Sequence, residues 1–270
     1  MLRILSDLHF RDASSHLTSL EQLAPVLDGV STLWLNGDTC DNQTGMSPAQ
    51  LNDIKQFFFQ RVPVVQFITG NHDPDISETH HCSAASGRLF ATHGDAFLDE
   101  IVPWSRVGHK LSTRVQQAQF DHPRLDIESL DGRLGLFRHA CARFPRECDP
   151  ARRNITHRIR RFATEFFPPR QPWAMIQTWR SFADRVAIRQ PDWCSTSQII
   201  ATGHVHFPRV WRRGDLTIVN TGAFSGPLGA FCVDLAQDTV TVRRLKKQGS
   251  VWHPGPTHTT IALAPPRSAP

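Results

Sequence analysis

The sequence predicts a layered α/β fold, because short apolar runs that end in polar clusters alternate with stretches of helical character. The first 95 residues contain four runs with the length and composition of strands, at 2–5, 32–35, 62–69 and 88–91. The last third of the chain contains five more, at 198–202, 210–211, 216–220, 230–235 and 239–245. We expect the last two to form a hairpin around Gln237-Asp238.

A helix is predicted between the second and third strands. Ser47 is a good N-cap residue, Pro48 suits the first helical position, and Gln50 completes a capping box with Ser47. Strand and helix signals therefore follow one another here as a layered α/β fold requires.

The middle of the chain, residues 96–197, has a different pattern with no clear strand. In its centre Ile155, Ile159 and Phe162 recur at helical spacing, while arginines occupy other positions of the same helix. We interpret this segment as a helical insertion that interrupts a domain of residues 1–247. Residues 248–270 are rich in Pro and Thr, and we expect a loosely ordered tail there.

The net charge of +5 is concentrated in that middle segment. Residues 96–197 hold 17 Lys and Arg against 11 Asp and Glu, whereas the rest of the chain holds 13 against 14. A basic segment favours an anionic partner, such as a phosphorylated substrate, a lipid headgroup surface or nucleic acid.

Two compositional features bear on location. No run approaches the roughly 20 apolar residues that span a bilayer, and residues 1–5 lead into a charged motif instead of a signal-peptide core. The six cysteines include no C-x-x-C pair, so neither a zinc ribbon nor a disulfide framework is indicated. We therefore expect a cytoplasmic protein, with peripheral attachment to the inner membrane as an extension of that expectation.

Five polar clusters follow the ends of predicted strands. They are Asp7-Leu8-His9, Gly37-Asp38, Gly70-Asn71-His72-Asp73, His93-Gly94-Asp95 and Gly203-His204-Val205-His206. Such strand ends are where α/β folds bind ligands, and carboxylate, amide and imidazole groups suit Mn, Fe or Zn. One carboxylate that spans two ions can hold them about 3.5 to 4 Å apart. The set therefore predicts a site for two metal ions.

Each cluster taken alone has an ordinary explanation. Asp-x-His and Gly-Asp occur by chance in many proteins, a His-x-His pair can be a solvated strand, and Asn71 beside Gly70 can be a turn residue. The prediction rests on all five clusters occurring in order at strand ends.

This ordered set resembles the signature of the calcineurin-like metallophosphoesterase superfamily, which is D-x-H, G-D, G-N-H-D, a lone His and G-H-x-H. The resemblance implies a four-layer α/β/β/α sandwich, with the helical insertion between the fourth and fifth motifs. It implies that one ion is held by Asp7, His9, Asp38 and His206. It implies that a second ion is held by Asp38, Asn71, His93 and His204.

The resemblance also implies a binuclear hydrolase in which a metal-bridging hydroxide attacks phosphorus. Manganese is the expected metal, with iron or zinc as alternatives. His72 is expected to face the scissile phosphate as a hydrogen-bond donor or general acid, without binding metal. Asp73 is expected to orient the His72 ring, because the two residues are adjacent in the sequence.

For the substrate, the basic insertion resembles the lid of UDP-2,3-diacylglucosamine hydrolases, although His72 stands where that branch usually has Arg. Aromatic residues of the insertion, among them Trp173, Trp179 and Phe182, either line an acyl pocket or form the core of the insertion itself. The expected partner is a phosphorylated small molecule or a lipid-linked substrate, with contact to an anionic membrane. The alternatives are a nucleic-acid or cyclic-nucleotide phosphodiesterase, a protein phosphatase, or an interaction scaffold without metal.

Overall fold

Two β-sheets form the centre of the molecule in a computed structural model that describes residues 1–41, 46–142, 144 and 170–265. The first sheet has the strand order β11-β10-β9-β1-β2-β3, and the second has the order β4-β5-β6-β8-β7. In the first sheet β1, β2 and β3 are parallel, and in the second β5, β6 and β8 are parallel. The strands of the first sheet are β1 (Leu2–Leu5), β2 (Thr32–Asn36), β3 (Val64–Ile68), β9 (Phe231–Ala236), β10 (Thr239–Gln248) and β11 (Val251–Ala262). Those of the second are β4 (His81–Ala84), β5 (Leu89–Thr92), β6 (Ile199–Thr202), β7 (Arg209–Arg213) and β8 (Leu216–Asn220).

The described residues form four apolar cores, and alternation of apolar residues along the strands separates the three that involve the sheets. On β1, Ile4 faces the second sheet and Leu5 faces the opposite side, as the two-residue period of a strand requires. On β6, Ile199 likewise packs between the sheets while Ile200 faces outward. Because both sheets bury both faces, each needs a further layer outside it.

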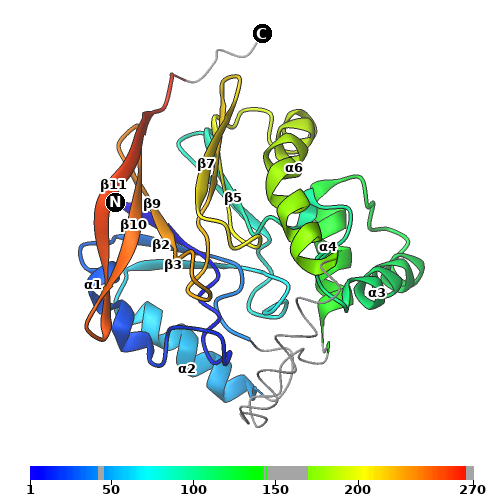
Figure 1. Ribbon diagram of the computed structural model, residues 1–270, viewed down its shortest axis with the longest axis horizontal. Helices are drawn as coiled ribbons and strands as arrows, with labels where there is room; N and C mark the ends of the chain where they lie inside the picture. Colours follow the sequence, from blue (N-terminus) through cyan, green and yellow to red (C-terminus); the bar gives the residue numbers. More distant parts are fainter. Residues whose placement is uncertain (42–45, 143, 145–169, 266–270) are drawn as a thin grey trace.

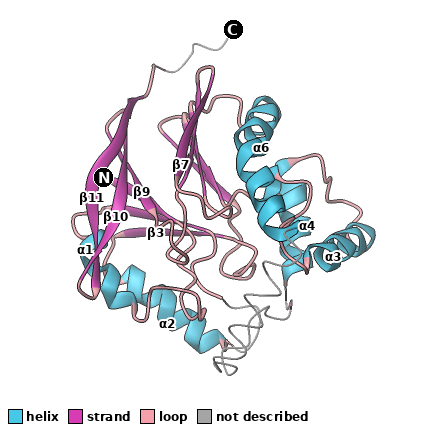
Figure 2. Ribbon diagram, viewed as in Figure 1, coloured by secondary structure: helices cyan, strands magenta, loops and turns pink. Residues whose placement is uncertain are grey.

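Helices provide these outer layers, and the result is a four-layer α/β/β/α arrangement (Figure 1). The helices α1 (Ala24–Leu27) and α2 (Pro48–Phe59) cover the outer face of the first sheet, preceded by the 3₁₀ turn η1 (Leu20–Leu23). On the second sheet the covering helices are α4 (Leu130–Cys141) and α6 (Arg170–Trp193), which pack with the 3₁₀ turn η2 (Asp95–Phe97). The helix α3 (Gly108–Asp121) lies beyond them against α4 (Figure 2).

Most predicted elements of the sheets are confirmed. The strands predicted at 2–5 and 216–220 have those bounds, and β9 and β10 form the predicted hairpin around Gln237-Asp238. The capping box that begins α2 is present in full: the Ser47 hydroxyl accepts from the Gln50 backbone, and the Gln50 side chain accepts from the Ser47 backbone.

The expectation of a loosely ordered tail from residue 248 is wrong for most of that segment. Residues 251–262 form β11, which pairs with β10 along its length. Pro254 and Pro256 suggested a break in structure, but β11 is an edge strand, where a missing N–H costs no ladder bond. The register shift between Arg243 and Leu245 occurs opposite the stretch that contains both prolines, and a further shift lies between Val242 and Arg243. The short polar strand β4 was not predicted either.

The described part of residues 96–197, called the helical segment below, contains the end of η2 followed by α3, α4 and α6, and no strand. The arginine-rich helix predicted around residues 152–161 lies outside the described residues. No helix in the described ranges is long and apolar enough to cross a membrane.

Candidate metal centre

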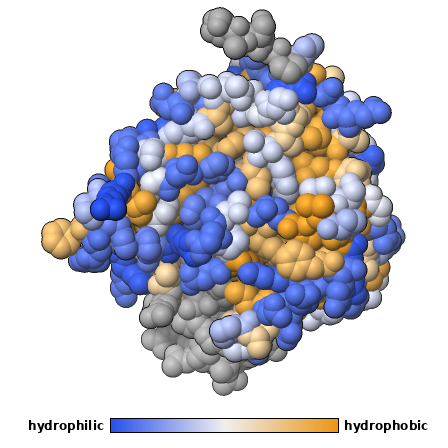
Figure 3. All heavy atoms as spheres, turned by 180° about the vertical axis from the view of Figure 1, so that it is seen from behind, coloured by the Kyte–Doolittle hydropathy of each residue, from blue (hydrophilic) through white to orange (hydrophobic). Residues whose placement is uncertain are grey.

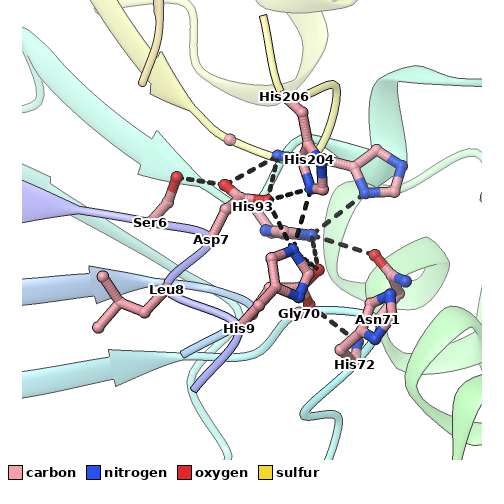
Figure 4. Close-up of polar contacts among 12 residues, drawn as sticks. Ser6, Asp7, Leu8, His9, Gly70, Asn71, His72, His93, His204 and His206 are labelled. Carbon is pink, nitrogen blue, oxygen red and sulfur yellow. Dashed lines mark hydrogen bonds and ion pairs between the residues drawn. The ribbon is translucent and has the colours of Figure 1, made fainter. Parts of the chain in front are cut away.

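The five predicted clusters come together at one place, because each follows the carboxyl end of a parallel strand. Asp7, Asp38 and Asn71 follow β1, β2 and β3 of the first sheet. His93 and His204 follow β5 and β6 of the second. Figure 4 shows the imidazole rings of His9 and His206 beside the Asp7 carboxylate, and the rings of His93 and His204 turned toward each other.

One group of side chains consists of Asp7, His9, Asp38 and His206. The Nε2 atoms of His9 and His206 lie 3.0 Å apart. Asp7 Oδ1 is 3.2 Å from the His206 nitrogen and 3.9 Å from the His9 nitrogen. Four potential ligand atoms of this group therefore converge on one point.

A second group consists of Asp38, His93 and His204, with Asn71 beside it. His93 Nε2 lies 3.2 Å from His204 Nδ1 and 3.2 Å from Asn71 Oδ1. Backbone carbonyls fix both rings: Nδ1–H of His93 donates to Asn36, and Nε2–H of His204 donates to Ile101. Each ring is thereby left with its other nitrogen facing the group.

Asp38 links the two groups through a single oxygen. Its Oδ2 lies 3.7 Å from His9 Nε2 in the first group and 3.4 Å from His93 Nε2 in the second. Its Oδ1 accepts a hydrogen bond of 2.8 Å from the backbone N–H of His72, which fixes the orientation of the carboxylate. This oxygen of Asp38 therefore lies between the two groups of side chains.

The spacing and chemistry of these donors fit divalent metal ions. Ligand atoms that each lie about 2.0–2.2 Å from one ion are separated from one another by roughly 3 to 4.4 Å. The separations given above fall within that range. In each group, the one potential ligand atom that each carboxylate or imidazole offers lies within 4.8 Å of the others. Oxygen and imidazole donors without thiolate suit Mn, Fe or Zn.

Backbone strain is concentrated at the same residues. Five non-glycine residues of the two groups have positive φ angles: Asp7 at 51°, His9 at 46°, Asp38 at 52°, His204 at 67° and His206 at 52°. Left-handed geometry costs a non-glycine residue on the order of 1 kcal/mol or more, and persists where the surroundings enforce it. A Cβ at Gly203 would overlap the Asp7 carboxylate, so no side chain fits there.

The protonation of several groups also suits metal binding. Burial lowers the pKa of His9 to about 4 and, together with the charge of His93, that of His204 to about 3. These rings are therefore neutral near pH 7, as metal ligands must be. Burial raises the pKa of Asp38, but the charges of His93 and His72 outweigh it and hold the pKa well below its ordinary value. Although burial lowers the pKa of His93, the Asp38 carboxylate in turn raises it above its ordinary value, so this ring has to lose its proton when a metal ion binds.

His72 lies at the margin of this centre instead of within either group. Its ring packs edge-on against that of His9, with centroids 4.9 Å apart, and its side chain is 30% exposed. The His206 side chain is 36% exposed, whereas those of Asp7 and Asp38 are almost fully buried. The centre therefore opens to solvent beside His72 and His206.

Asp73 has a different role from the one assigned to it. Both its oxygens accept backbone N–H bonds of 2.7 to 3.3 Å, from Asp38, Thr39, Cys40 and Gly70. The carboxylate near the His72 ring is that of Asp41, whose Oδ1 lies 4.0 Å from His72 Nδ1. Asp41 was missed. The only signal of it in the sequence is a second acidic residue three positions after Asp38, whereas its burial is seen only in the structure.

No protein-family model matches the chain, and no curated protein is similar enough to count as a match. Solved structures with a similar course of the chain include vacuolar protein sorting 29 from Cryptosporidium parvum, at 13% identity over 97% of both chains and a TM-score of 0.43. A predicted phosphoesterase from Streptococcus pneumoniae has 13% identity over 97% of this chain and 96% of its own, with a TM-score of 0.39. A dimetal phosphatase from Danio rerio has 11% identity over 97% of this chain and 98% of its own, with a TM-score of 0.45. At these identities and TM-scores, the chemistry of this chain has to be inferred from its own site.

Proposed function

We propose that this protein is a metal-dependent phosphoesterase that hydrolyses a phosphoester or pyrophosphate bond at a binuclear centre. The observation that carries the proposal is Asp38, whose Oδ2 lies between two imidazole-containing groups at 3.7 and 3.4 Å. The first ion is assigned to Asp7, His9, Asp38 and His206. The second is assigned to Asp38, Asn71, His93 and His204.

Divalent ions at these positions would acidify a water molecule into a nucleophile and neutralise the charge of the phosphate oxygens. The residues of the chain have the task of holding that geometry in a buried site with one open side. His72 stands at this opening, 30% exposed, where its ring can donate a hydrogen bond to a phosphoryl oxygen or protonate a leaving group. The proposal treats His72 as a catalytic residue and Asp73 as the support of the ligand loops.

The finer parts of the proposal concern the substrate and its surroundings. The resemblance in sequence and the basic excess of residues 96–197 favour a large anionic substrate of the UDP-2,3-diacylglucosamine type, met at an anionic membrane surface from the cytoplasm. The exposed large apolar residues include Phe120, Ile188 and Trp173, which lie on α3 and α6. On the face opposite to that of Figure 1, apolar residues are interspersed with hydrophilic ones (Figure 3).

The proposed reaction is tested by metal analysis together with hydrolysis of a chromogenic aryl phosphodiester. We expect about two equivalents of manganese, iron or zinc per chain, and hydrolysis that a chelator abolishes and added Mn²⁺ restores. The matched control is Asp131→Ala, which removes an exposed carboxylate outside the centre and should leave both readouts unchanged. A protein that binds no metal and hydrolyses no ester after loading with Mn²⁺, Fe²⁺ or Zn²⁺ would contradict the proposal.

The substrate is tested by a screen of the Mn²⁺-loaded protein. Nucleotide sugars with and without acyl chains, cyclic nucleotides, phosphopeptides and single-stranded DNA represent the substrate classes that the sequence left open. We expect the acylated nucleotide sugar to have the highest kcat/KM. Faster turnover of any other class would replace the substrate assignment while leaving the metal chemistry in place.

A further inference from the structure

The turn that presents His204 and His206 is strained. The backbone N–H of Val205 donates to the carbonyl of Gly203 over 2.8 Å, and the residue between them, His204, has a φ of 67°. A three-residue turn closed by a hydrogen bond from the third residue to the first, with a positive φ at the central residue, is the rare and strained form of the γ-turn. Such a turn persists only where neighbouring groups enforce it.

Part of this enforcement comes from the two sheets. The N–H of Gly203 donates to the carbonyl of His93 over 2.8 Å, and the N–H of His204 donates to both oxygens of Asp7 at 3.0 and 3.1 Å. The side-chain amide of Asn220 donates to the carbonyl of Gly203. These contacts hold the beginning of the turn.

The end of the turn is held by the helical segment. The indole Nε1–H of Trp179, on α6, donates to the carbonyl of Val205 over 2.8 Å. The same indole stacks on Phe207, directly after His206, with ring centroids 4.6 Å apart and an interplanar angle of 16°. Trp179 therefore contacts the residue on each side of His206, by a hydrogen bond to Val205 and by stacking on Phe207.

A second contact from the helical segment acts on His204. The carbonyl of Ile101 accepts from its Nε2–H at 2.6 Å, and the Trp104 ring packs against the imidazole with centroids 5.2 Å apart. The orientation of both histidines in this loop thus depends on residues between positions 101 and 179.

We propose that Trp179 is a positioning residue of the metal centre, which holds the Gly203–His206 turn in its metal-binding shape from outside the two sheets. This inference rests on the proposed function, because it requires that His204 and His206 bind metal. It gives the helical segment a structural role at the centre that is independent of any contact with substrate. Loss of an outer-sphere hydrogen bond to a metal ligand typically weakens metal binding by about 10- to 100-fold, and we take this range for a bond to the residue between two candidate ligands.

The test compares two tryptophans of the same helix. In Trp179→Phe the ring is kept and the donor to Val205 is lost. In Trp193→Phe the same change removes a hydrogen bond of 2.9 Å from the indole to the Glu128 carbonyl. Neither Trp193 nor Glu128 is next to a candidate metal ligand. The Mn²⁺ affinity of each metal-free protein is measured by competition with a chelator. The absorption spectrum of the Co²⁺-loaded protein reports the ligand geometry.

We expect Trp179→Phe to bind Mn²⁺ about 10- to 100-fold more weakly with an altered Co²⁺ spectrum, and Trp193→Phe to match the unmodified protein. Equal affinities for all three proteins would overturn the inference, as would equal losses in both variants, which would indicate a general weakening of α6. If Trp179→Phe does not fold, Phe207→Leu takes its place, because it removes the ring on which the indole stacks. We expect this variant to lose less Mn²⁺ affinity than the range given above. An unchanged Mn²⁺ affinity would overturn the inference. If the unmodified protein binds no metal, it is the proposed function that fails.

Discussion

The two sheets supply their ligands to the centre by different means. Loops of the first sheet are held from within, since the carboxylate of Asp73 accepts four backbone N–H groups from residues 38–40 and Gly70. The Gly203–His206 loop of the second sheet is held in part by the helical segment, through Trp179 and the carbonyl of Ile101. One half of the site is therefore self-supporting, and the other depends on residues 96–197.

This difference shows that the two groups of candidate ligands have separate supports, which meet at one residue. Asp38 follows a strand of the first sheet, and its carboxylate is a member of both groups of side chains. A change at Asp38 should affect both halves of the centre, whereas a change in either support should begin with one of them.

The largest effect is expected from Asp38→Ala. Because this carboxylate is assigned to both ions, its loss should abolish binuclear occupancy and reduce hydrolysis to the rate of the metal-free protein. Metal analysis and an aryl phosphodiester assay measure the two quantities. A variant that still carries two metal ions per chain would show that Asp38 is not a bridging ligand.

A large effect on activity alone is expected from His72→Ala. His72 lies at the opening and is assigned to chemistry, so the variant should keep its metal while hydrolysis falls about 10²- to 10⁴-fold. The control is His16→Ala, at an exposed histidine outside the centre. Loss of metal together with activity would instead make His72 a ligand.

The support of the first sheet is tested by Asp73→Ala. The substitution removes the acceptor of four backbone N–H groups, and each one left unsatisfied costs about 1–3 kcal/mol. We expect the free energy of unfolding to fall by about 3 kcal/mol or more, measured by urea denaturation of the metal-free protein. Asp95→Ala is the comparison, because the Asp95 carboxylate accepts the backbone N–H of Ala96. Equal destabilisation by both changes would argue against a special role for Asp73.

The smallest effect is expected at Asn36, which joins the two sheets. Its side-chain amide, fully buried at the end of β2, donates to the carbonyls of Thr92 and Ala201 in the second sheet at 2.9 and 3.3 Å. Asn36→Leu keeps the branched shape and the number of heavy atoms and loses both bonds, which should cost about 1–3 kcal/mol and lower the occupancy of the second ion first. Val219→Ala makes a cavity between the same sheets and should destabilise the fold without changing the metal ratio. A full metal complement in Asn36→Leu would contradict this linkage.

The sequence was sufficient to predict features that depend on local pattern. Strand β1, the capping box at Ser47 and the hairpin at Gln237-Asp238 all follow from residues that are neighbours in the chain. The five polar clusters could be found because each follows a strand end, and parallel strands bring such ends together. The individual candidate ligands within them were implied by the resemblance to the metallophosphoesterase signature.

Features that depend on distant parts of the chain were missed. The bond from Trp179 to Val205 joins residues 26 positions apart through a backbone carbonyl, which leaves no mark in the sequence. Asp73 was assigned by adjacency to His72, whereas folding places its carboxylate under the loop that begins at Asp38. The strand β11 was obscured by prolines that only an edge position tolerates.

The distribution of the ligands along the chain has a consequence for how the centre is assembled. His9 and His206 are 197 positions apart, and their rings meet only after both sheets have formed and packed together. In the unfolded chain a metal ion can bind only ligand pairs that are close in the sequence, such as Asp7 with His9 or His204 with His206. We expect the full set of candidate ligands to assemble only after the transition state for folding, and a bound ion should therefore slow unfolding far more than it speeds folding. Stopped-flow refolding that is accelerated by Mn²⁺, with an unchanged unfolding rate, would indicate instead that the metal gathers its ligands early.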